Sequence, residues 1–206
     1  TPTSVTQQGM NAMKALNIIT CILTLSLLLV AGCAQSPQRV WLEPKLHVPT
    51  SSVGEGRVVA VDVVDRRPSP SLGNFGKSRD AATELSTEQD VALVVKQEVI
   101  SGMRKKGFVA VEEQTNRDAK LNVEIQSLEY ATSPNTWTGD VYIKSALKAV
   151  ASKNGKTLEK MYRANFDKRV VVVPTATTNE QWINEALGDV LRQLLEDREL
   201  SFFLTN

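Results

Sequence analysis

The chain has 206 residues, with 24 lysines and arginines against 23 aspartates and glutamates, so its formal net charge is +1. This balance gives no electrostatic reason to expect a nucleic-acid partner, because surfaces that bind nucleic acid are strongly basic. The length suits one domain with a sizeable core, and two cysteines and one histidine exclude most disulfide frameworks and metal centres.

The N-terminal part of the chain has the pattern of a secretory signal. Lys14 precedes an apolar run over 15–31, which is shorter than the ~20 apolar residues of a membrane-spanning helix. The run ends in a lipobox, the processing site of bacterial lipoproteins, formed by Val30, Ala31, Gly32 and Cys33. We therefore predict a signal peptide over 1–32, with cleavage before the cysteine and acylation of its thiol. The alternative is a stop-transfer helix that contains a cysteine.

Acylation of Cys33 predicts a lasting attachment to a membrane. Each buried methylene contributes about 0.8 kcal/mol, and two chains already hold a protein firmly; a bacterial lipoprotein cysteine normally carries three, palmitate among them. Ala34 permits transfer to the outer membrane, where an aspartate would favour retention in the inner one. We expect the protein to face the periplasm from the outer membrane of a Gram-negative bacterium. We also expect Met10 or Met13 to be the true start, so that 1–9 or 1–12 is an upstream extension.

Removal of the signal peptide restricts the chemistry of the mature chain. The only charge lost is Lys14, so 24 basic residues become 23, which equals the 23 acidic residues. Cys21 leaves with the signal peptide and Cys33 is acylated, which excludes a disulfide, a thiolate nucleophile and a cysteine-ligated metal. His47 has no second histidine with which to complete a metal site. We expect no cofactor and no metal.

The mature chain is predicted to consist of a lipidated tether, 33–39, and one globular domain, 40–206. The domain begins with an alternating apolar segment that Pro44 interrupts, which favours an edge strand. The β-branched run Val58–Val64 predicts a central strand that is covered on both faces. The stretch 66–85 contains prolines and glycines and is predicted to be irregular.

A helix is predicted to begin near residue 86 and to end at Gly107. Two overlapping capping boxes mark its start, Ser86 with Gln89 and Thr87 with Asp90. Its apolar face is formed by Val91, Val94, Val95, Val99 and Met103. A strand over 108–111 follows, and the order strand, helix, strand predicts a right-handed crossover between parallel strands.

The next predicted strand changes phase part-way along. Leu121, Val123 and Ile125 alternate with polar residues, but the following apolar residues are Leu128 and Tyr130. One residue is therefore out of step near Gln126-Ser127, which predicts a β-bulge or a kink at that point.

The clearest local signal is the dipeptide Asn154-Gly155, because a two-residue hairpin turn needs positive φ at both positions. If this is the turn, Lys153 lies opposite Lys156. Three apolar pairs then fall on one face of the hairpin: Ile143 with Phe166, Leu147 with Tyr162, and Ala151 with Leu158.

The last part of the chain is predicted to be helical. Pro174 ends the preceding strand, and Thr177 with Glu180 forms a capping box. The helix carries a core stripe of Ile183, Ala186, Leu187, Val190, Leu191 and Leu194, and Leu200, Phe202, Phe203 and Leu204 are expected to pack as a C-terminal clasp. The predicted fold is α+β: a single two-layer domain in the order β-α-β-β-β-β-α. Its mixed, mostly antiparallel sheet of about four to five strands carries two main helices on one face.

The segment from Asn154-Gly155 to Lys160-Met161-Tyr162-Arg163-Ala164-Asn165-Phe166, with the later helix around Asn184-Glu185-Ala186-Leu187, resembles the YajG family of bacterial lipoproteins. The order of lipobox, tether, valine strand, helix, hairpin and final helix is similar as well. These motifs are structural, so the resemblance implies a fold and an envelope location but no catalytic residue. The layout also resembles lipoproteins of the LpoB type, which activate peptidoglycan synthases, by analogy only.

Two loops are candidates for contact with a partner. The stretch from Ser71 to Ser78 imitates a phosphate-binding loop, but it lacks the first glycine and its Lys77 lies well ahead of the next helix. We interpret it as a surface loop that presents Leu72, Phe75 and Lys77 to a partner. Trp137 lies in a second polar loop and is a further candidate contact residue.

Two sets of carboxylates are candidates for catalytic groups. Asp62 and Asp65 are three residues apart on a strand, so they point to opposite faces and are expected to form salt bridges or loop caps. An envelope hydrolase would need acids such as Glu112, Glu113 or Glu129 to converge in a cleft.

The predicted function is therefore that of a non-catalytic interaction domain, anchored by lipid in the cell envelope. Its expected partner is an envelope protein or a component of peptidoglycan synthesis. The alternatives are the carboxylate hydrolase and a small-ligand or lipid carrier with an apolar cavity between sheet and helices.

Overall fold

The computed structural model describes residues 37–206 apart from 76–82, 113–116, 135–138 and 172–173. The predicted signal peptide and lipobox, with Cys33, lie outside the described residues, as do Lys77 and Trp137. Within the described part, no helix is long and apolar enough to span a membrane.

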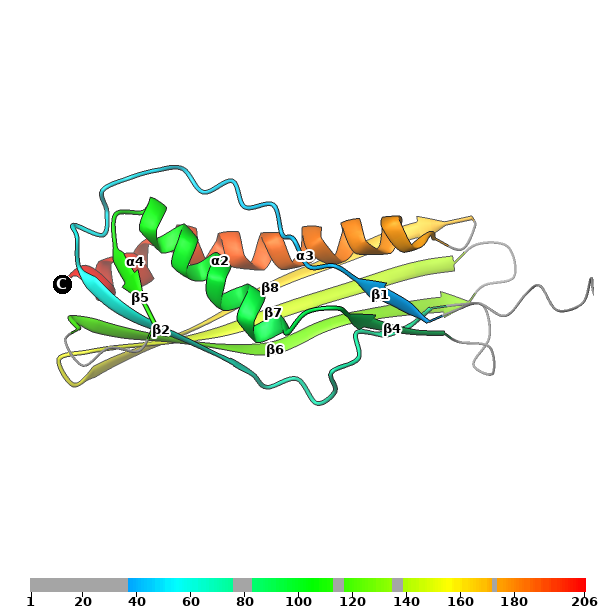
Figure 1. Cartoon of the computed structure of the whole chain (residues 1–206), viewed down its shortest axis with the longest axis horizontal. Helices are drawn as coiled ribbons and strands as arrows, with labels where there is room; N and C mark the ends of the chain where they lie inside the picture. The colour runs from blue at the N-terminus through cyan, green and yellow to red at the C-terminus, as the bar shows by residue number, and fades with distance from the viewer. Residues whose placement is uncertain (1–36, 76–82, 113–116, 135–138, 172–173) are drawn as a thin grey trace, which may run out of the picture. The chain divides into compact units, whose positions relative to one another are not determined.

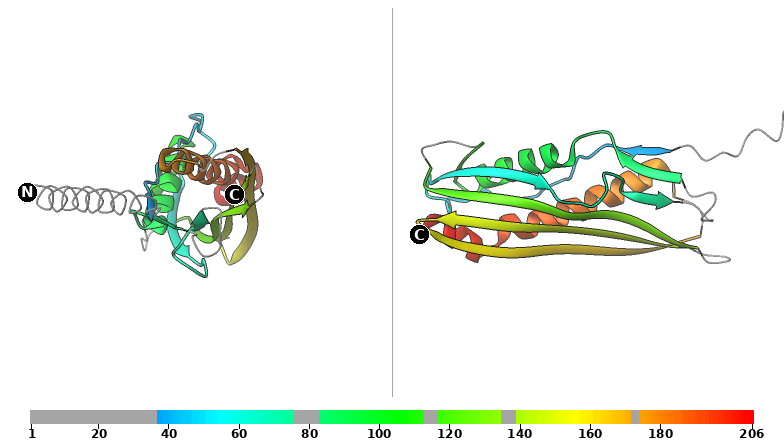
Figure 2. Two further views of the ribbon diagram at one scale, coloured as in Figure 1. Left: turned by 90° about the vertical axis from the view of Figure 1, so that its right-hand side faces the viewer. Right: turned by 90° about the horizontal axis from the view of Figure 1, so that it is seen from below.

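Among the described residues, eight strands form one mixed sheet, and three helices cover one of its faces (Figure 1). The α+β class and the placement of the helices match the prediction, but the sheet has more strands than the four to five expected and a different element order. The strands are β1 (Gln38–Val40), β2 (Val58–Asp65), β3 (Gly73–Phe75), β4 (Thr83–Thr87), β5 (Val109–Val111), β6 (Ala119–Pro134), β7 (Gly139–Lys153) and β8 (Lys156–Val170). The helices are α2 (Val91–Lys105), α3 (Ala176–Glu196) and α4 (Arg198–Thr205). The right-hand view of Figure 2 shows that β6, β7 and β8 run the length of the domain.

The predicted parallel crossover is confirmed. The strand β2 pairs in parallel with β5, and α2 lies between them in sequence. The apolar face predicted for this helix is buried throughout. Its cap, however, is Asp90, whose carboxylate accepts hydrogen bonds from the amides of Ala92 and Leu93. Ser86 and Thr87 do not cap the helix because they belong to β4.

The long antiparallel pairs have the predicted register. Lys153 lies opposite Lys156, and the three predicted apolar pairs face one another along β7 and β8. Asn154 and Gly155 have φ values of 50° and 74°, as the turn requires. The pairing of β6 with β7 shifts by one residue between Ile125 and Ser127, which is the predicted bulge.

The C-terminal helices bury the predicted core stripe, but two details differ from the prediction. The cap of α3 is Thr175, whose hydroxyl accepts a hydrogen bond from the amide of Thr178, so the predicted cap Thr177 lies inside the helix. In α4, Leu200 and Leu204 are buried whereas Phe202 is 68% exposed. The C-terminal segment therefore clasps the core with only part of its apolar residues.

The expectation that Leu72 and Phe75 project from a surface loop is wrong. Both side chains are at most 1% exposed and belong to the hydrophobic core. The backbone of Leu72 donates to the carbonyl of Leu85 (2.8 Å) and accepts from the amide of Tyr130 (2.6 Å), so this segment is joined to β4 and β6. Because this segment pairs with strands that are distant in sequence, it needs no hydrophobic period of its own. The sequence of the segment therefore does not indicate that Leu72 and Phe75 are buried.

Gly73 makes this pairing possible. Its φ is +135°, and a Cβ atom at this position would lie 1.9 Å from the carbonyl oxygen of Tyr130. Gly73, which lies within the stretch that imitates a phosphate-binding loop, is thus required for close contact with β6.

We expect Gly73→Ala to lower the free energy of unfolding by about 2–4 kcal/mol, because β3 must move away from β6. Gly155→Ala is the matched control: its φ is also positive, but no atom lies within 4 Å of the added Cβ, so a loss of about 1 kcal/mol is expected. Urea unfolding of both variants measures the difference. Equal losses would show that contact with β6 is not what requires a glycine here.

Candidate functional site

The extended segment 41–50, called the strap below, crosses the helical layer between β1 and β2. Gln89, just before α2, holds it from one side: the side-chain oxygen accepts from the amide of Leu42 (2.6 Å) and the side-chain nitrogen donates to its carbonyl (3.1 Å). Because one side chain satisfies both backbone groups of one residue, it replaces the hydrogen bonds of a neighbouring strand.

Asn184 of α3 holds the strap from the other side. Its side-chain oxygen accepts from the amide of Glu43 (2.7 Å), and its nitrogen donates to the carbonyl of Trp41 (2.9 Å). The amide of Trp41 donates to the carboxylate of Glu180 (2.9 Å). Three consecutive strap residues are therefore bound to both helices.

A buried polar chain fixes the strand from which the strap starts. The hydroxyl of Tyr130 donates to the side-chain oxygen of Asn179 (2.8 Å), whose nitrogen donates to the side-chain oxygen of Gln38 in β1 (2.9 Å). Burial raises the pKa of Tyr130 to about 12, so the phenol stays protonated at neutral pH. This chain joins β6, α3 and β1 and has the character of a structural support.

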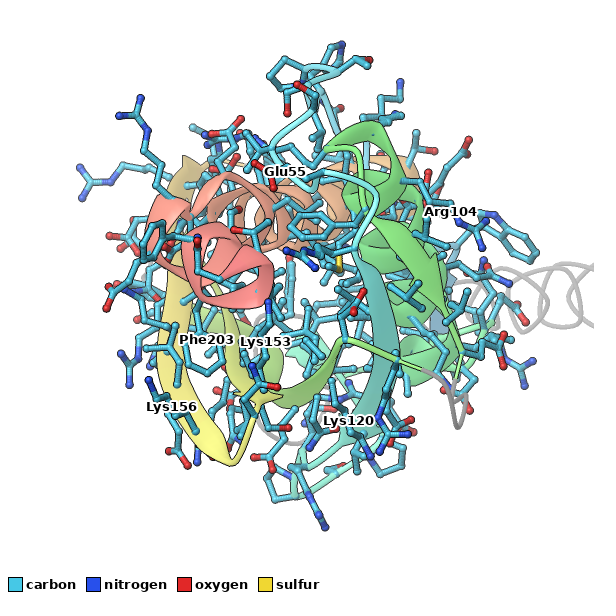
Figure 3. All side chains as sticks on the ribbon, turned by 90° about the vertical axis from the view of Figure 1, so that its left-hand side faces the viewer. Glu55, Arg104, Lys120, Lys153, Lys156 and Phe203 are labelled. Atoms are coloured by element: carbon cyan, nitrogen blue, oxygen red, sulfur yellow. The ribbon has the colours of Figure 1, made fainter. Side chains whose placement is uncertain are left out.

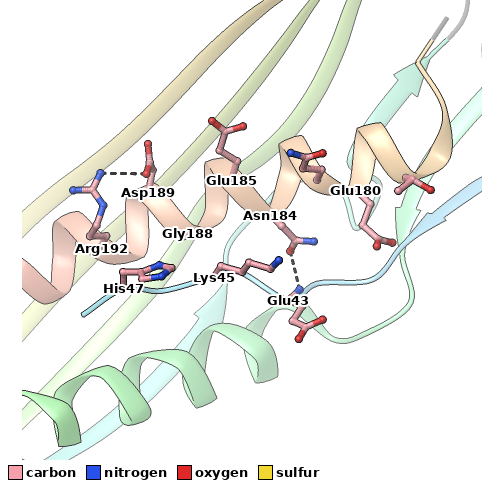
Figure 4. A pocket seen from close by; sticks show the side chains of 11 residues that line it. Glu43, Lys45, His47, Glu180, Asn184, Glu185, Gly188, Asp189 and Arg192 are labelled. Atoms are coloured by element: carbon pink, nitrogen blue, oxygen red, sulfur yellow. Dashed lines mark hydrogen bonds and ion pairs between the residues drawn. The ribbon is translucent and has the colours of Figure 1, made fainter. Parts of the chain in front are cut away.

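A polar groove of about 700 Å³ lies along α3 beside the strap (Figure 4). Four carboxylates line it: Glu43, Glu180, Glu185 and Asp189. Asp189 binds Arg192 (3.1 Å), Glu185 lies 3.8 Å from Lys168, and Glu180 binds the strap. His47 is also here, yet the described residues contain no group of three or more metal-ligating side chains. Three of the four carboxylates therefore already have a partner within the domain.

A second pocket, called the tip pocket below, lies at the end of the sheet where β7 turns into β8 (Figure 3). Its volume is about 340 Å³. It is lined by Lys153, Asn154, Lys156, Leu158, Glu199, Phe202, Phe203 and Asn206. Figure 3 shows Phe203 and Lys153 next to α4 and Lys156 on the hairpin.

The two lysines of the tip pocket lie on the face of the sheet that carries the helices. Residues two apart in a strand share a face, so Lys153 follows buried Ala151, and Lys156 precedes partly buried Leu158. The ammonium group of Lys153 donates to the carbonyl of Leu204 in α4 (3.0 Å). Core-facing positions are therefore charged at this end of the hairpin.

Asp197 holds α4 against β8 and so forms one wall of the pocket. One carboxylate oxygen accepts from the amides of Glu199 (2.8 Å) and Leu200 (3.1 Å). The other accepts from the hydroxyl of Tyr162 (2.8 Å) and lies 3.3 Å from the ammonium group of Lys160. Burial by itself raises the pKa of Asp197, but these donors outweigh it and lower the pKa. Burial and Asp197 both raise the pKa of Tyr162.

The carboxylates singled out in the sequence do not form a joint site. Asp62 lies 3.5 Å from Lys96, and Asp65 accepts from the backbone and guanidinium of Arg67, as the salt-bridge interpretation predicted. Burial raises the pKa of Asp65, and the hydrogen bonds from Arg67 more than reverse this, so that the pKa is lowered.

The acids suggested for a hydrolase lie far apart where they are described. Glu112 is the residue after Val111. Val111 of β5 and Lys120 of β6 both pair with Ala60 of β2, so they lie at the same level of the sheet. Glu129 is nine residues farther along β6, about 30 Å away at 3.3 Å per residue. Glu113 lies outside the described residues.

The lipid-carrier alternative also lacks its cavity in the described part of the molecule. The pocket found between α2, the C-terminal helices and the sheet has a volume of about 10 Å³, room for about one water molecule. Apolar side chains fill the remainder of the space between the layers.

Comparison with known proteins assigns the chain to a family. Residues 44–205 match Lipoprotein_16, described as an uncharacterized lipoprotein family. The chain belongs to this family. Lipoprotein_16 membership implies a membrane-anchored protein of the cell envelope.

Individual relatives agree with this assignment. The uncharacterized lipoprotein YajG of Escherichia coli K12 is 19% identical over 181 residues, which cover 87% of this chain and 92% of the relative. The resemblance to YajG is thereby confirmed. Protein XCC0632 from Xanthomonas campestris has a similar fold, with a TM-score of 0.51 at 14% identity over 82% of this chain and 96% of that one.

We expect Asn184→Ala to lower the free energy of unfolding by about 1–2 kcal/mol, because two strap backbone groups lose their partner. Gln181→Ala, at an exposed neighbouring position of α3, is the control and should change it by less than about 0.5 kcal/mol. Chemical denaturation measures both. If Asn184→Ala left the free energy of unfolding unchanged, the strap would not depend on the hydrogen bonds of this side chain.

Asp197 predicts a pH dependence. Because its folded pKa is lowered, its contribution to stability is present above its ordinary pKa of 3.8 and is lost as the pH falls through the lower folded value. Asp197→Asn should therefore cost about 1–3 kcal/mol at pH 7 and distinctly less near pH 3. Urea unfolding at the two pH values measures this difference. Asp189→Asn, in an exposed ion pair, should cost less than about 1 kcal/mol at either pH; a pH-independent cost for Asp197→Asn would contradict the assignment.

Proposed function

We propose that this lipoprotein is a non-catalytic contact domain, held by acylated Cys33 at the periplasmic face of the outer membrane, and that it meets its partner at the tip pocket. The observation that carries the proposal is the separation within the domain between β1, which the predicted tether precedes in sequence, and the tip pocket. The tether enters the domain at β1, and the tip pocket lies at the opposite end of the sheet (Figure 1).

The register of the strands supports this separation. Gln38 of β1 pairs with Leu85 of β4, and Leu85 pairs with Gly73 of β3. Gly73 pairs with Tyr130 of β6, which pairs with Ile143 of β7. Gln38 and Ile143 therefore lie at the same level of the sheet. Ten residues of β7 separate Ile143 from Lys153, about 34 Å at 3.4 Å per residue. An anchored domain that stands away from its membrane would carry the tip pocket outward.

The strap suits a domain that is pulled by its tether. Tension applied at β1 passes through Gln89 and Asn184 into both helices, as well as through the hydrogen bonds of β1 with β4. A load that is shared in this way does not peel a single edge strand from the sheet. The clamps thus favour a role in which the domain keeps its shape while it is attached at both ends.

An envelope protein or a component of peptidoglycan synthesis is the proposed class of partner. This proposal is supported by the expected location in the cell envelope and by the similarity of layout to LpoB-type lipoproteins, which is an analogy. The separation of Glu112 from Glu129 and the filled core favour contact over hydrolysis or lipid transport.

A photo-crosslinking amino acid placed at Lys156 in living cells tests the contact. We expect a discrete high-mass adduct, because this side chain is exposed at the tip. The same amino acid at Leu93, which is 52% exposed on α2, is the matched control and should give little adduct. Cys33→Ser should reduce the Lys156 adduct by removing the anchor. Equal adducts at both positions, or adducts at Leu93 alone, would contradict a contact at the tip.

A further inference from the structure

We propose that the tip pocket binds a free single-chain anionic amphiphile, with its carboxylate or phosphate head at Lys153 and Lys156 and its apolar chain over Phe202 and Phe203. The inference rests on the proposed function in taking the tip as the contact end. It adds the chemistry of the occupant.

The charge at the rim of the pocket is the first argument. Lys153 and Lys156 lie directly opposite each other beside the turn, and like charges in this position destabilise a hairpin. Neither lysine forms an ion pair with the described residues, although Lys153 donates to a backbone carbonyl of α4. An anion between the two ammonium groups would relieve the repulsion and accept charge-assisted hydrogen bonds from both.

Glu199, the one acidic side chain among the residues that line the pocket, does not offset this charge. Glu199 is held by Lys160, with 2.5 Å between the carboxylate oxygen and the ammonium nitrogen. Lys160 also contacts Asp197, so it fastens the acid to the junction of α3 and α4. The pocket thus keeps two cations for a ligand while its carboxylate is already paired.

The apolar side of the pocket is the second argument. Leu158 and Phe203 are partly buried and pack against the core, and they form a floor that continues the core to the surface. Phe202 beside them is 68% exposed. Contact with an acyl chain would remove this aromatic surface from water, which is favourable in proportion to the area covered.

The size of the pocket suits a small molecule. Its volume of about 340 Å³ is within the ~300–1,000 Å³ typical of small-molecule sites. Stable protein interfaces bury about 1,200–2,000 Å² in total, so a protein partner at this end of the domain would also contact residues beyond the eight that line the pocket. The cations and the apolar floor lie side by side, which matches a molecule with one charged end.

The test uses the full-length lipoprotein in phosphatidylcholine nanodiscs and a dodecanoate with a photoreactive diazirine at the chain end. After irradiation, mass spectrometry should map adducts to 199–206 and 153–158. The double variant Lys153→Gln/Lys156→Gln should reduce these adducts at least about fivefold, because both head-group contacts are lost. Lys120→Gln, a lysine at the same end of the sheet but away from α4, is the matched control and should leave them unchanged (Figure 3).

Several results would overturn the proposal. Equal labelling by a dodecylamine probe would show that the charge of the head does not matter. Labelling that survives the double substitution would remove the lysines from the site. Tip adducts that require phosphatidylglycerol in the nanodisc would assign the pocket to a membrane head group. If dodecanoate labels the tip but the crosslinker at Lys156 gives no adduct in cells, the amphiphile site is supported and the contact function is contradicted. If the crosslinker gives an adduct but dodecanoate does not label the tip, the contact function is supported and the amphiphile site is contradicted.

Discussion

The register of the β7–β8 hairpin is the constraint on which the rest of the structure depends. Positive φ at Asn154 and Gly155 closes the turn in one way, and this fixes every residue pair along both strands. A shift by one residue would turn Leu147 and Tyr162 away from the helices. The same register that builds the core therefore sets Lys153 and Lys156 on the core-facing side at the end of the sheet.

Two polar devices then fix the helices over this surface. Asp197 ends α3, caps α4 and binds Tyr162 and Lys160 of β8, so one carboxylate positions a wall of the tip pocket. The clamps of Gln89 and Asn184 act far from the tip, where they bind the strap that leads from the tether into the domain. At the β1 end of the domain, hydrogen bonds hold the strap in place. At the other end, beside the β7–β8 turn, the tip pocket is open to solvent.

The parts of this arrangement that depend on local pattern could be predicted from sequence. The Asn154-Gly155 register, the bulge beside Ile125 and the buried stripe of α3 each follow from turn chemistry or periodicity. The edge strand predicted from Val40 onward is wrong in position, because β1 ends at Val40 and the irregular strap follows. The short strands β3 and β4 could not be predicted, because three to five residues show no period and their stability comes from distant partners. Burial of Leu72 and Phe75 was missed for this reason, and the tip pocket was missed because it arises only when α4 packs beside the hairpin.

We propose that contact is made at the tip and not along the strap. Hydrogen–deuterium exchange on the full-length lipoprotein, compared between intact envelopes and phosphatidylcholine nanodiscs, distinguishes the two surfaces. Contact at the tip predicts slower exchange in envelopes at 153–158 and 199–206, with the strap groove over 177–192 unchanged. Protection confined to the strap groove, or no difference at the tip, would contradict it.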